Sequence, residues 1–184
     1  MIRPSALQLA ESCGLASRLA EGNPETSEAA ARGTAIHHAI ATGNAGHSEE
    51  AEAALNWLDG FTSAVGGQHD LEVKVQLFDG IGTLLTEGTA DVVVNRQEDG
   101  LDVIDWKTGR IDGAAEPDDN LQLHAYGLAA AQRYHAPAYR LLIVYLDGPM
   151  THVRTSARYP MAEAGPMLAR LAKASSAPPE ASTG

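Results

Sequence analysis

The segment Leu101-Asp102-Val103-Ile104-Asp105-Trp106-Lys107 is the most informative part of this sequence. Its apolar residues predict a buried β-strand, and side chains alternate between the two faces of a strand. Asp105 and Lys107 therefore share one face, and Trp106 points to the other. A carboxylate and an ammonium side by side at a strand end can bind a divalent metal and position a water, which is the outline of a site for phosphodiester hydrolysis.

A second acid, Asp91, lies fourteen positions before Asp105. If the segments 89–95 and 101–107 form a hairpin, these two carboxylates sit almost opposite each other. They then repel unless a cation lies between them or one of them takes up a proton, and oxygen ligands favour Mg²⁺ or Mn²⁺. Two simpler interpretations stay open: Asp91 as a turn residue, and Lys107 as a strand-end lysine that only neutralises Asp105.

The composition limits the classes of function. The chain has 184 residues, of which 44% are hydrophobic, which predicts one globular domain with a real core. Its formal charge of -11 argues against a broad surface for binding nucleic acid, because such surfaces use Lys and Arg to neutralise phosphates. A small footprint bridged by a bound cation remains compatible with this charge.

Cysteine content and hydropathy predict a cytoplasmic protein without a membrane partner. Cys13 is the only cysteine, which excludes an intrachain disulfide and a cysteine-based zinc cluster. The first residues, Met1-Ile2-Arg3-Pro4, lack the apolar stretch of a secretory signal. No apolar run approaches the roughly 20 residues that span a bilayer.

Periodicity predicts the order of helices and strands. Helices are expected over residues 5–21, 27–42, 49–65, 119–135 and 160–173, with Ser48 as an N-cap. Strands are expected at residues 69–78, 81–87, 89–95, 101–107, 139–146 and 151–156, the first four as an antiparallel meander. The fold class is therefore α/β or α+β, with a central sheet flanked by helices. We expect a single domain over residues 1–174 and a disordered tail over 175–184.

Two further patterns carry polar side chains that chemistry could use. His37 and His38 are neighbours on a predicted helix and cannot both face one site, and a lone histidine is more often a packing residue than a ligand. Gly33, inside the same helix, suggests close approach to another element. Gln122 and Tyr126, one helical turn apart, fit either a helix surface with a half-buried tyrosine or a pair that binds phosphate or braces the lysine.

Together these motifs resemble the RecB-type branch of the PD-(D/E)xK nuclease superfamily. The matching elements, in the family's order, are Gly-Thr-x-x-His at residues 33–37, Gly-x-x-Asp at 88–91, Asp-x-Lys followed by Thr-Gly at 105–109, and Gln-x-x-x-Tyr at 122–126. The resemblance covers residues 32–126. It implies a restriction-endonuclease-like αβββαβ core with a central mixed sheet.

The resemblance also implies a metal site. His37, Asp91 and Asp105 would be the ligands of Mg²⁺ or Mn²⁺, and the Trp106 carbonyl would add a further oxygen. Glu72 resembles the acidic residue that many relatives carry on the preceding strand. Because an imidazole ligand suits Mn²⁺ better than Mg²⁺, we expect higher activity with Mn²⁺.

The same resemblance implies a function and its partners. Lys107 would be the catalytic lysine, and Gln122 and Tyr126 would border the DNA-binding groove. The expected activity is that of a metal-dependent deoxyribonuclease, an exonuclease of phage or recombination type that acts in DNA processing, recombination or repair. Its expected partners are DNA and a recombination or single-strand-binding protein.

One departure and two alternatives accompany the resemblance. The spacing from Ser5 to Cys13 is similar to that of relatives with an iron–sulfur cluster, but the three later cysteines are absent, so no such cluster can form. The first alternative is a catalytically inactive member of the fold that acts as an interaction or structural protein. The second is a nuclease that acts on RNA, since no residue pattern here reads a 2′-hydroxyl.

Overall fold

A five-stranded mixed sheet forms the centre of the protein in the computed structural model, which describes residues 28–108 and 116–176. The strands follow the sequence order β1-β2-β3-β4-β5. Only the β3–β4 pairing is parallel; the other three are antiparallel. The strand bounds are β1 (Gln68–Phe78), β2 (Leu84–Asn95), β3 (Leu101–Thr108), β4 (Ala138–Asp147) and β5 (Met150–Pro160).

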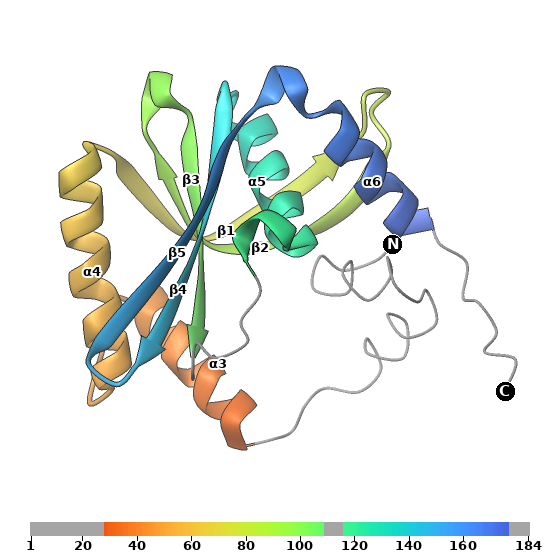
Figure 1. Ribbon diagram of the computed structural model, residues 1–184. Coiled ribbons are helices and arrows are strands. Elements are labelled where there is room, and N and C mark those ends of the chain that lie inside the picture. The colour runs from red at the N-terminus through yellow and green to blue at the C-terminus, as the bar shows by residue number, and fades with distance from the viewer. Residues whose placement is uncertain (1–27, 109–115, 177–184) are drawn as a thin grey trace, which may run out of the picture.

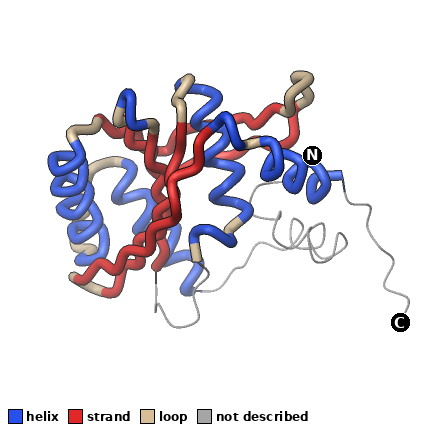
Figure 2. The backbone as a smooth tube through the Cα atoms, turned by 45° about the horizontal axis from the view of Figure 1, so that its top comes forward, coloured by secondary structure: helices blue, strands red, loops and turns tan. Residues whose placement is uncertain are grey.

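Helices cover both faces of this sheet. In Figure 1, α3 and α4 lie on one side of the strands and α5 and α6 on the other, and the tube in Figure 2 shows the same layers. No helix of the described residues is long and apolar enough to cross a membrane. The helix bounds are α3 (Glu28–Ala41), α4 (Glu49–Val65), α5 (Leu121–Tyr134) and α6 (Gly165–Ser176), with short 3₁₀ turns η2 (Gln97–Asp99), η3 (Pro117–Asp119) and η4 (Met161–Glu163). The predicted fold class, helices around a central mixed sheet, is confirmed.

The ends of α4 show why the sequence folds this way locally. The Ser48 side chain accepts a hydrogen bond from the Ala51 backbone N–H, and acidic residues occupy the first turn. Gly66 ends the helix with φ of 67°, a left-handed conformation that glycine adopts without steric penalty. The predicted N-cap and end of this helix are both confirmed.

β3 lies between two hydrophobic cores. Val103 packs into the core beneath α5 and α6, and Ile104 and Trp106 pack into the core beneath α3 and α4. Both faces of the strand are therefore buried, and its apolar residues Leu101, Val103, Ile104 and Trp106 divide between the two cores. The alternation also turns Asp105 away from Trp106, as predicted.

The structure corrects the predicted strands at residues 81–87 and 89–95. They form one continuous strand, β2, because Gly88 pairs with Val75 of β1 instead of breaking the ladder. The preceding turn is closed by Asp79, whose side chain accepts hydrogen bonds from the backbone N–H groups of Ile81 and Thr83.

Both ends of the final helix differ from the prediction, β5 runs on to Pro160 beyond the predicted 151–156, and two predicted segments cannot be compared with the structure. The final helix begins at Gly165 and not at Pro160, because the first residues after β5 form η4. It also extends through Ser176, into the segment predicted as a tail. The predicted helix at residues 5–21 and the rest of the tail lie outside the described residues.

β2 divides the sheet into two parts. It pairs with β1 along its whole length, but with β3 only over its last four residues, from Val92 to Asn95. The outer β1–β2 arm therefore separates from β3 and runs beneath α5 (Figure 1). The point of separation, which we call the fork, lies just before Val92 and creates a gap between strands where polar side chains can gather.

Two glycines inside helices give a matched test of this packing. A Cβ at Gly127 of α5 would lie 2.4 Å from the Tyr139 ring of β4, whereas a Cβ at Gly60 of α4 would meet nothing within 4 Å. We expect Gly127→Ala to destabilise the protein by about 1–3 kcal/mol through overpacking. We expect Gly60→Ala to stabilise it by about 0.5–1 kcal/mol through helix propensity. Urea unfolding of both variants measures this, and stabilisation by Gly127→Ala would contradict the α5–β4 packing.

Candidate active site

Asp91 lies at the fork. The last β2–β3 pair is Val92 with Ile104, so Asp91 and Asp105 occupy the next step of the same register, where the ladder has ended. One carboxylate oxygen of Asp91, Oδ2, accepts a hydrogen bond of 2.9 Å from the Trp106 backbone N–H. The side chain thus replaces the strand that would otherwise satisfy this N–H group.

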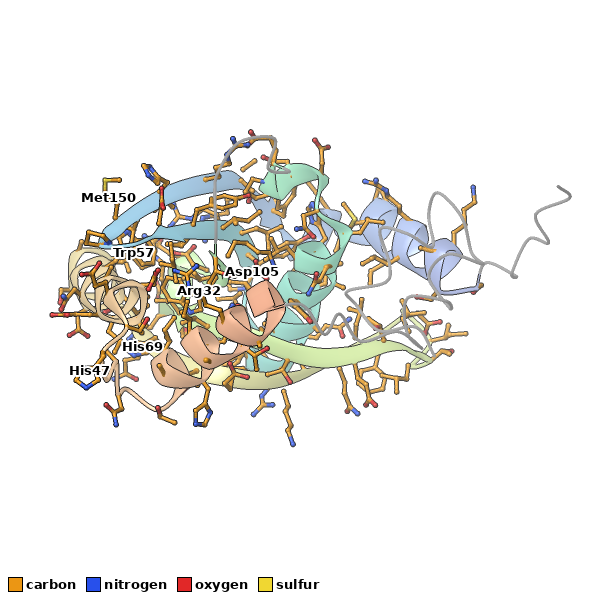
Figure 3. All side chains as sticks on the ribbon, turned by 90° about the horizontal axis from the view of Figure 1, so that it is seen from below. Arg32, His47, Trp57, His69, Asp105 and Met150 are labelled. Carbon is orange, nitrogen blue, oxygen red and sulfur yellow. The ribbon has the colours of Figure 1, made fainter. Side chains whose placement is uncertain are left out.

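Asp105 and Lys107 are in direct contact on the α5 side of β3. The Lys107 ammonium nitrogen lies 2.7 Å from Asp105 Oδ2. The Asp105 side chain is only 8% exposed, whereas that of Lys107 is 44% exposed. Apart from this ion pair, the described residues give Asp105 Oδ2 no hydrogen-bond partner. Figure 3 shows Asp105 between α3 and α5.

Burial and neighbouring charge set the protonation of this pair. Burial raises the pKa of Asp105 to about 6, against the opposing effect of the Lys107 charge, and the Asp91 charge raises it further. Burial alone would lower the pKa of Lys107, but the adjacent Asp105 carboxylate outweighs it, so that pKa is raised. Lys107 is therefore an ammonium at neutral pH, and the Asp105 carboxylate is held ionised in an unfavourable environment.

His37 reaches the fork from α3. Gly33, one turn earlier, lies so close to β3 that a Cβ there would be 3.2 Å from the Thr108 hydroxyl, which confirms the predicted close approach. The His37 Nδ1 atom is 3.5 Å from Asp91 Oδ1, and the hydrogen bond to Asp91 raises the pKa of His37. The neighbouring His38 is exposed, so only one of the two histidines faces the site, as predicted.

Glu72 of β1 lies beside Asp91. The pairs Leu71–Val92 and Val73–Ala90 flank this position, which places Glu72 opposite Asp91 in the register. Its φ of 49° is rare for a residue other than glycine, and such strained backbones concentrate at functional sites. Burial, followed by the Asp91 charge, raises the pKa of Glu72. Three acids from adjacent strands thus share one row across the fork.

Gln122 and Tyr126 cover the site from α5. The Gln122 Nε2 group donates a hydrogen bond of 3.2 Å to the Tyr126 hydroxyl. Burial raises the pKa of Tyr126, and both Asp105 and Asp91 act on it electrostatically. The tyrosine is 8% exposed, more buried than the half-buried side chain of the simpler interpretation. The structure therefore brings this pair to the same place as the acids and the lysine.

The donor set at the fork is compatible in chemistry with a hard divalent cation. Carboxylates of Asp91 and Asp105, the carboxylate of Glu72 and the imidazole of His37 are ligands that Mg²⁺ and Mn²⁺ accept. A buried carboxylate that burial disfavours in its ionised form, as at Asp105, gains from a cation that compensates its charge. Within residues 28–108 and 116–176, however, no three His, Cys, Asp or Glu side chains already form a group that could hold an ion.

A cavity of about 850 Å³ lies elsewhere, along the β1–β2 arm. Its described lining comes from β1, β2 and the end of α5, and includes Phe78, Glu87 and Arg133. None of the side chains that meet at the fork is among these lining residues. The cavity has a single carboxylate and no neighbouring histidine in its described lining, so the fork and not this cavity is the candidate active site.

Two further polar residues near the site, Tyr145 of β4 and Arg154 of β5, belong to no motif of the sequence. Tyr145 pairs with Lys107 across the parallel β3–β4 ladder, and Arg154 pairs with Ile143, the β4 neighbour of Asp105. Both residues come after α5 in the sequence. The register that brings them to the site depends on a parallel pairing across that helix, and local sequence patterns carry no signal for it.

Comparisons with known proteins point to one family. The model of the PD-(D/E)XK nuclease superfamily matches residues 44–180. This span includes Asp91, Asp105, Lys107 and Tyr126, whereas His37 lies before it. No curated protein matches the chain.

Among solved structures, the crystal structure of SSO0001 is similar to this chain with a TM-score of 0.39 and 20% sequence identity. The similarity covers 66% of this chain and 55% of that one. The chain therefore spans little more than half the length of SSO0001.

Because the pKa of Asp105 is raised, replacing its carboxylate with a neutral side chain should increase the free energy of unfolding by an amount that depends on pH. The unfolded carboxyl ionises near pH 4 and the folded one near pH 6, so the stability that the protonated group contributes is lost as pH rises through 6. In metal-free buffer at pH 8, Asp105→Asn should therefore be more stable than the natural protein by about 1–3 kcal/mol. Below about pH 4.5 this difference should shrink toward zero.

Urea unfolding in EDTA at several pH values measures this difference. Asp59→Asn, at an exposed position of α4, is the matched control and should change stability by less than about 0.5 kcal/mol at every pH. An Asp105→Asn effect that does not depend on pH would show that burial does not disfavour the ionised carboxylate.

Proposed function

Because this chain belongs to the PD-(D/E)XK nuclease superfamily, we propose that it is a metal-dependent nuclease that hydrolyses phosphodiester bonds in DNA. One observation carries the proposal. Asp91 and Asp105 meet one step beyond the last β2–β3 pair, with the Lys107 ammonium 2.7 Å from Asp105. A buried acid beside a partly buried one, with a cation in contact, is costly to desolvate, and such clusters are found preferentially at functional sites.

The residues that would hold Mg²⁺ or Mn²⁺ are Asp91, Asp105 and His37, with the Trp106 carbonyl as a further oxygen ligand. Glu72, opposite Asp91, is a candidate for an outer ligand. When bound, the cation supplies polarisation of the scissile phosphate and makes water a stronger nucleophile. We expect Mn²⁺ to support higher activity than Mg²⁺, because imidazole is the softer donor of the set.

Lys107 has the charge and exposure to act on the substrate. Its raised pKa keeps it an ammonium at neutral pH, and its partly exposed side chain can leave Asp105 for a phosphate oxygen. An ammonium there stabilises the negative charge that grows on the phosphate during attack. This charge-stabilising role agrees better with the raised pKa than a role as general base.

Tyr126 and Gln122 would bind and orient the substrate. The Gln122 amide donates to the Tyr126 oxygen, so the phenol O–H can itself donate to a phosphate oxygen. The raised pKa of Tyr126 keeps this proton in place at neutral pH. The pair borders the acids and the lysine on the α5 side, where a DNA strand would pass.

We propose that the protein belongs to the RecB-type branch and acts as an exonuclease in DNA recombination or repair. The order and spacing of the four motifs support the branch. The net charge of -11 supports action at DNA ends, because an acidic protein gains little from nonspecific contacts along a duplex. A partner protein that delivers the DNA, such as a recombination or single-strand-binding protein, would compensate for this charge.

A specific observation keeps a second candidate function open, that of a catalytically inactive member of the fold. Both Asp91 oxygens have partners within the protein, His37 and the Trp106 N–H, and the Lys107 ammonium contacts Asp105. These contacts hold the site together without a ligand. Metal binding distinguishes the two functions.

Cleavage assays test the role of Lys107. The protein is incubated with Mg²⁺ or Mn²⁺ and with linear DNA that has free or blocked ends, circular DNA, and RNA. We expect degradation of DNA with free ends, faster in Mn²⁺, and a 10²- to 10⁴-fold lower kcat for Lys107→Ala. Lys173→Ala on α6 is the control and should leave the rate unchanged. Equal rates for Lys107→Ala and the natural protein would contradict the mechanism.

Calorimetric titration with Mn²⁺ tests the site without relying on cleavage. We expect binding by the natural protein and by Lys107→Ala, and at least 10-fold weaker binding by Asp91→Asn and Asp105→Asn. Asp59→Asn, the surface control, should bind as the natural protein does. No heat of binding for the natural protein would favour the inactive member of the fold.

A further inference from the structure

Two rows of side chains lead from the candidate active site to the edge of the sheet. In the first row, Asp105 of β3 is the partner of Ile143 on β4, which in turn is the partner of Arg154 on β5. Cross-strand partners lie side by side with their side chains on the same face. Ile143 packs into the core on the α5 side, so Arg154 belongs to the same face of the sheet as Asp105.

The second row runs parallel to the first. Lys107 of β3 is the partner of Tyr145 on β4, and Tyr145 is the partner of His152 on β5. The Tyr145 side chain is largely buried and His152 is exposed. The row therefore starts at the catalytic lysine of the proposed mechanism and ends at solvent on the edge strand.

Tyr145 connects the two rows electrostatically. Burial raises the pKa of its phenol, while the positive charges of Arg154 and Lys107 act in the opposite direction. The phenol therefore stays protonated at neutral pH and lies within the fields of both cations. A guanidinium, a phenol and an ammonium from three adjacent strands are donors suited to the oxygens of a polyanion.

Arg154 forms an ion pair with Glu116, the residue just before η3. The Arg154 side chain is 27% exposed and that of Glu116 is 58% exposed. An ion pair this exposed contributes little to stability. A phosphate, which offers several oxygens and a full negative charge, can replace the Glu116 carboxylate on the guanidinium.

Three other arginines, which follow β2 or lie on β4 and β5, bind a different carboxylate, that of Asp102. Asp102 is fully buried, and Arg140 binds it through two hydrogen bonds of 2.9 and 2.7 Å. Arg158 and Arg96 lie 3.3 and 3.6 Å from the same carboxylate. Removing any of them from Asp102 would leave a buried charge less well compensated. The printed ion pair of Arg154 is instead with Glu116, whose side chain is 58% exposed.

We propose that Arg154 and the Tyr145 phenol form a second phosphate subsite, which binds a backbone phosphate of the substrate strand next to the scissile one. The inference rests on the proposed nuclease function and specifies the path of the strand, from Asp105 and Lys107 across β4 toward β5. Adjacent strands are about 4.8 Å apart, so β5 lies roughly 10 Å from β3. The subsite therefore serves a phosphate about one or two nucleotides from the cleavage point.

Glu116 then has a role in the same subsite, as the competitor that a phosphate must displace. Removal of the Glu116 carboxylate takes away one anion that competes for the guanidinium and should strengthen DNA binding, whereas removal of Arg154 should weaken it. A pair with only a structural role would respond in one direction, because either substitution breaks the same ion pair. If the subsite exists, substitution of Arg154 and substitution of Glu116 therefore change the affinity for DNA in opposite directions.

The test compares Arg154→Gln and Glu116→Gln in steady-state cleavage of a linear DNA with Mn²⁺. We expect Arg154→Gln to raise KM about 10-fold with kcat changed less than 3-fold, and Glu116→Gln to lower KM about 3-fold. The slope of log binding constant against log salt concentration should be smaller in magnitude by about one unit for Arg154→Gln. Arg133→Gln is the matched control, since Arg133 also makes a polar contact, to the Lys74 carbonyl oxygen, but lies on the cavity side of α5. Its KM should not change.

Binding of a fluorescent oligonucleotide, measured in the Lys107→Ala background, separates this inference from the proposed function. If the natural protein cleaves DNA and Arg154→Gln keeps the natural KM and affinity, the subsite is wrong and the nuclease function stands. If the natural protein cleaves nothing while Arg154→Gln still weakens binding, the function is wrong and the phosphate contact stands. Changes of the same sign in Arg154→Gln and Glu116→Gln would overturn the subsite.

A folding defect is monitored by thermal melting of each variant. Arg154→Lys provides a second variant that keeps the charge but loses the planar donor pair. It should give a KM between those of the natural protein and Arg154→Gln. A KM for Arg154→Lys as high as that of Arg154→Gln, in a folded protein, would show that charge at this position does not contribute.

Discussion

The hydrogen bond from the Trp106 backbone N–H to the Asp91 carboxylate is the contact on which the arrangement of the site depends. β2 leaves β3 just before Val92, so the backbone of β3 beyond Ile104 has lost its antiparallel neighbour. An unsatisfied buried N–H group costs about 1–3 kcal/mol, and a side-chain acceptor at the fork removes that cost. Asp91 therefore allows two adjacent strands to separate without exposing their cores, and the gap between them is where the acids, histidine and lysine meet.

The separation of β2 from β3 concentrates negative charge at the fork. Glu72, Asp91 and Asp105 occupy one row across three strands, and burial with mutual repulsion raises the pKa of the first and the last. Lys107 and His37 compensate in part, each through one contact to one acid. The compensation is local and exchangeable, since Lys107 is partly exposed. Binding of a cation would relieve the repulsion among these acids, which is a property expected of a functional site and not of a structural core.

Sequence patterns predict those features of the fold and of the site that depend on local structure. The two-residue alternation of β3 placed Asp105 and Lys107 on one face and Trp106 on the other, and Ser48 marked the start of α4. The predicted break between residues 87 and 89 is wrong, because Gly88, a residue type that weakens strand interiors, pairs with Val75 within a continuous β2. The parallel pairing of β3 with β4 follows from the crossover through α5, so Tyr145 and Arg154 could be found only in three dimensions.

The distribution of arginines relates the fold to the acidic charge of the chain. Arg140, Arg158 and Arg96 surround the buried Asp102 and hold together the end of the sheet opposite the fork. Their charge stabilises the fold and is not available for a polyanion. Toward the fork, cations pair with exposed or exchangeable acids, as Lys107 does with Asp105 and Arg154 with Glu116. The same sheet thus has permanent ion pairs at one end and exchangeable ones at the other, and of these pairs the exchangeable ones can offer positive charge to a phosphate.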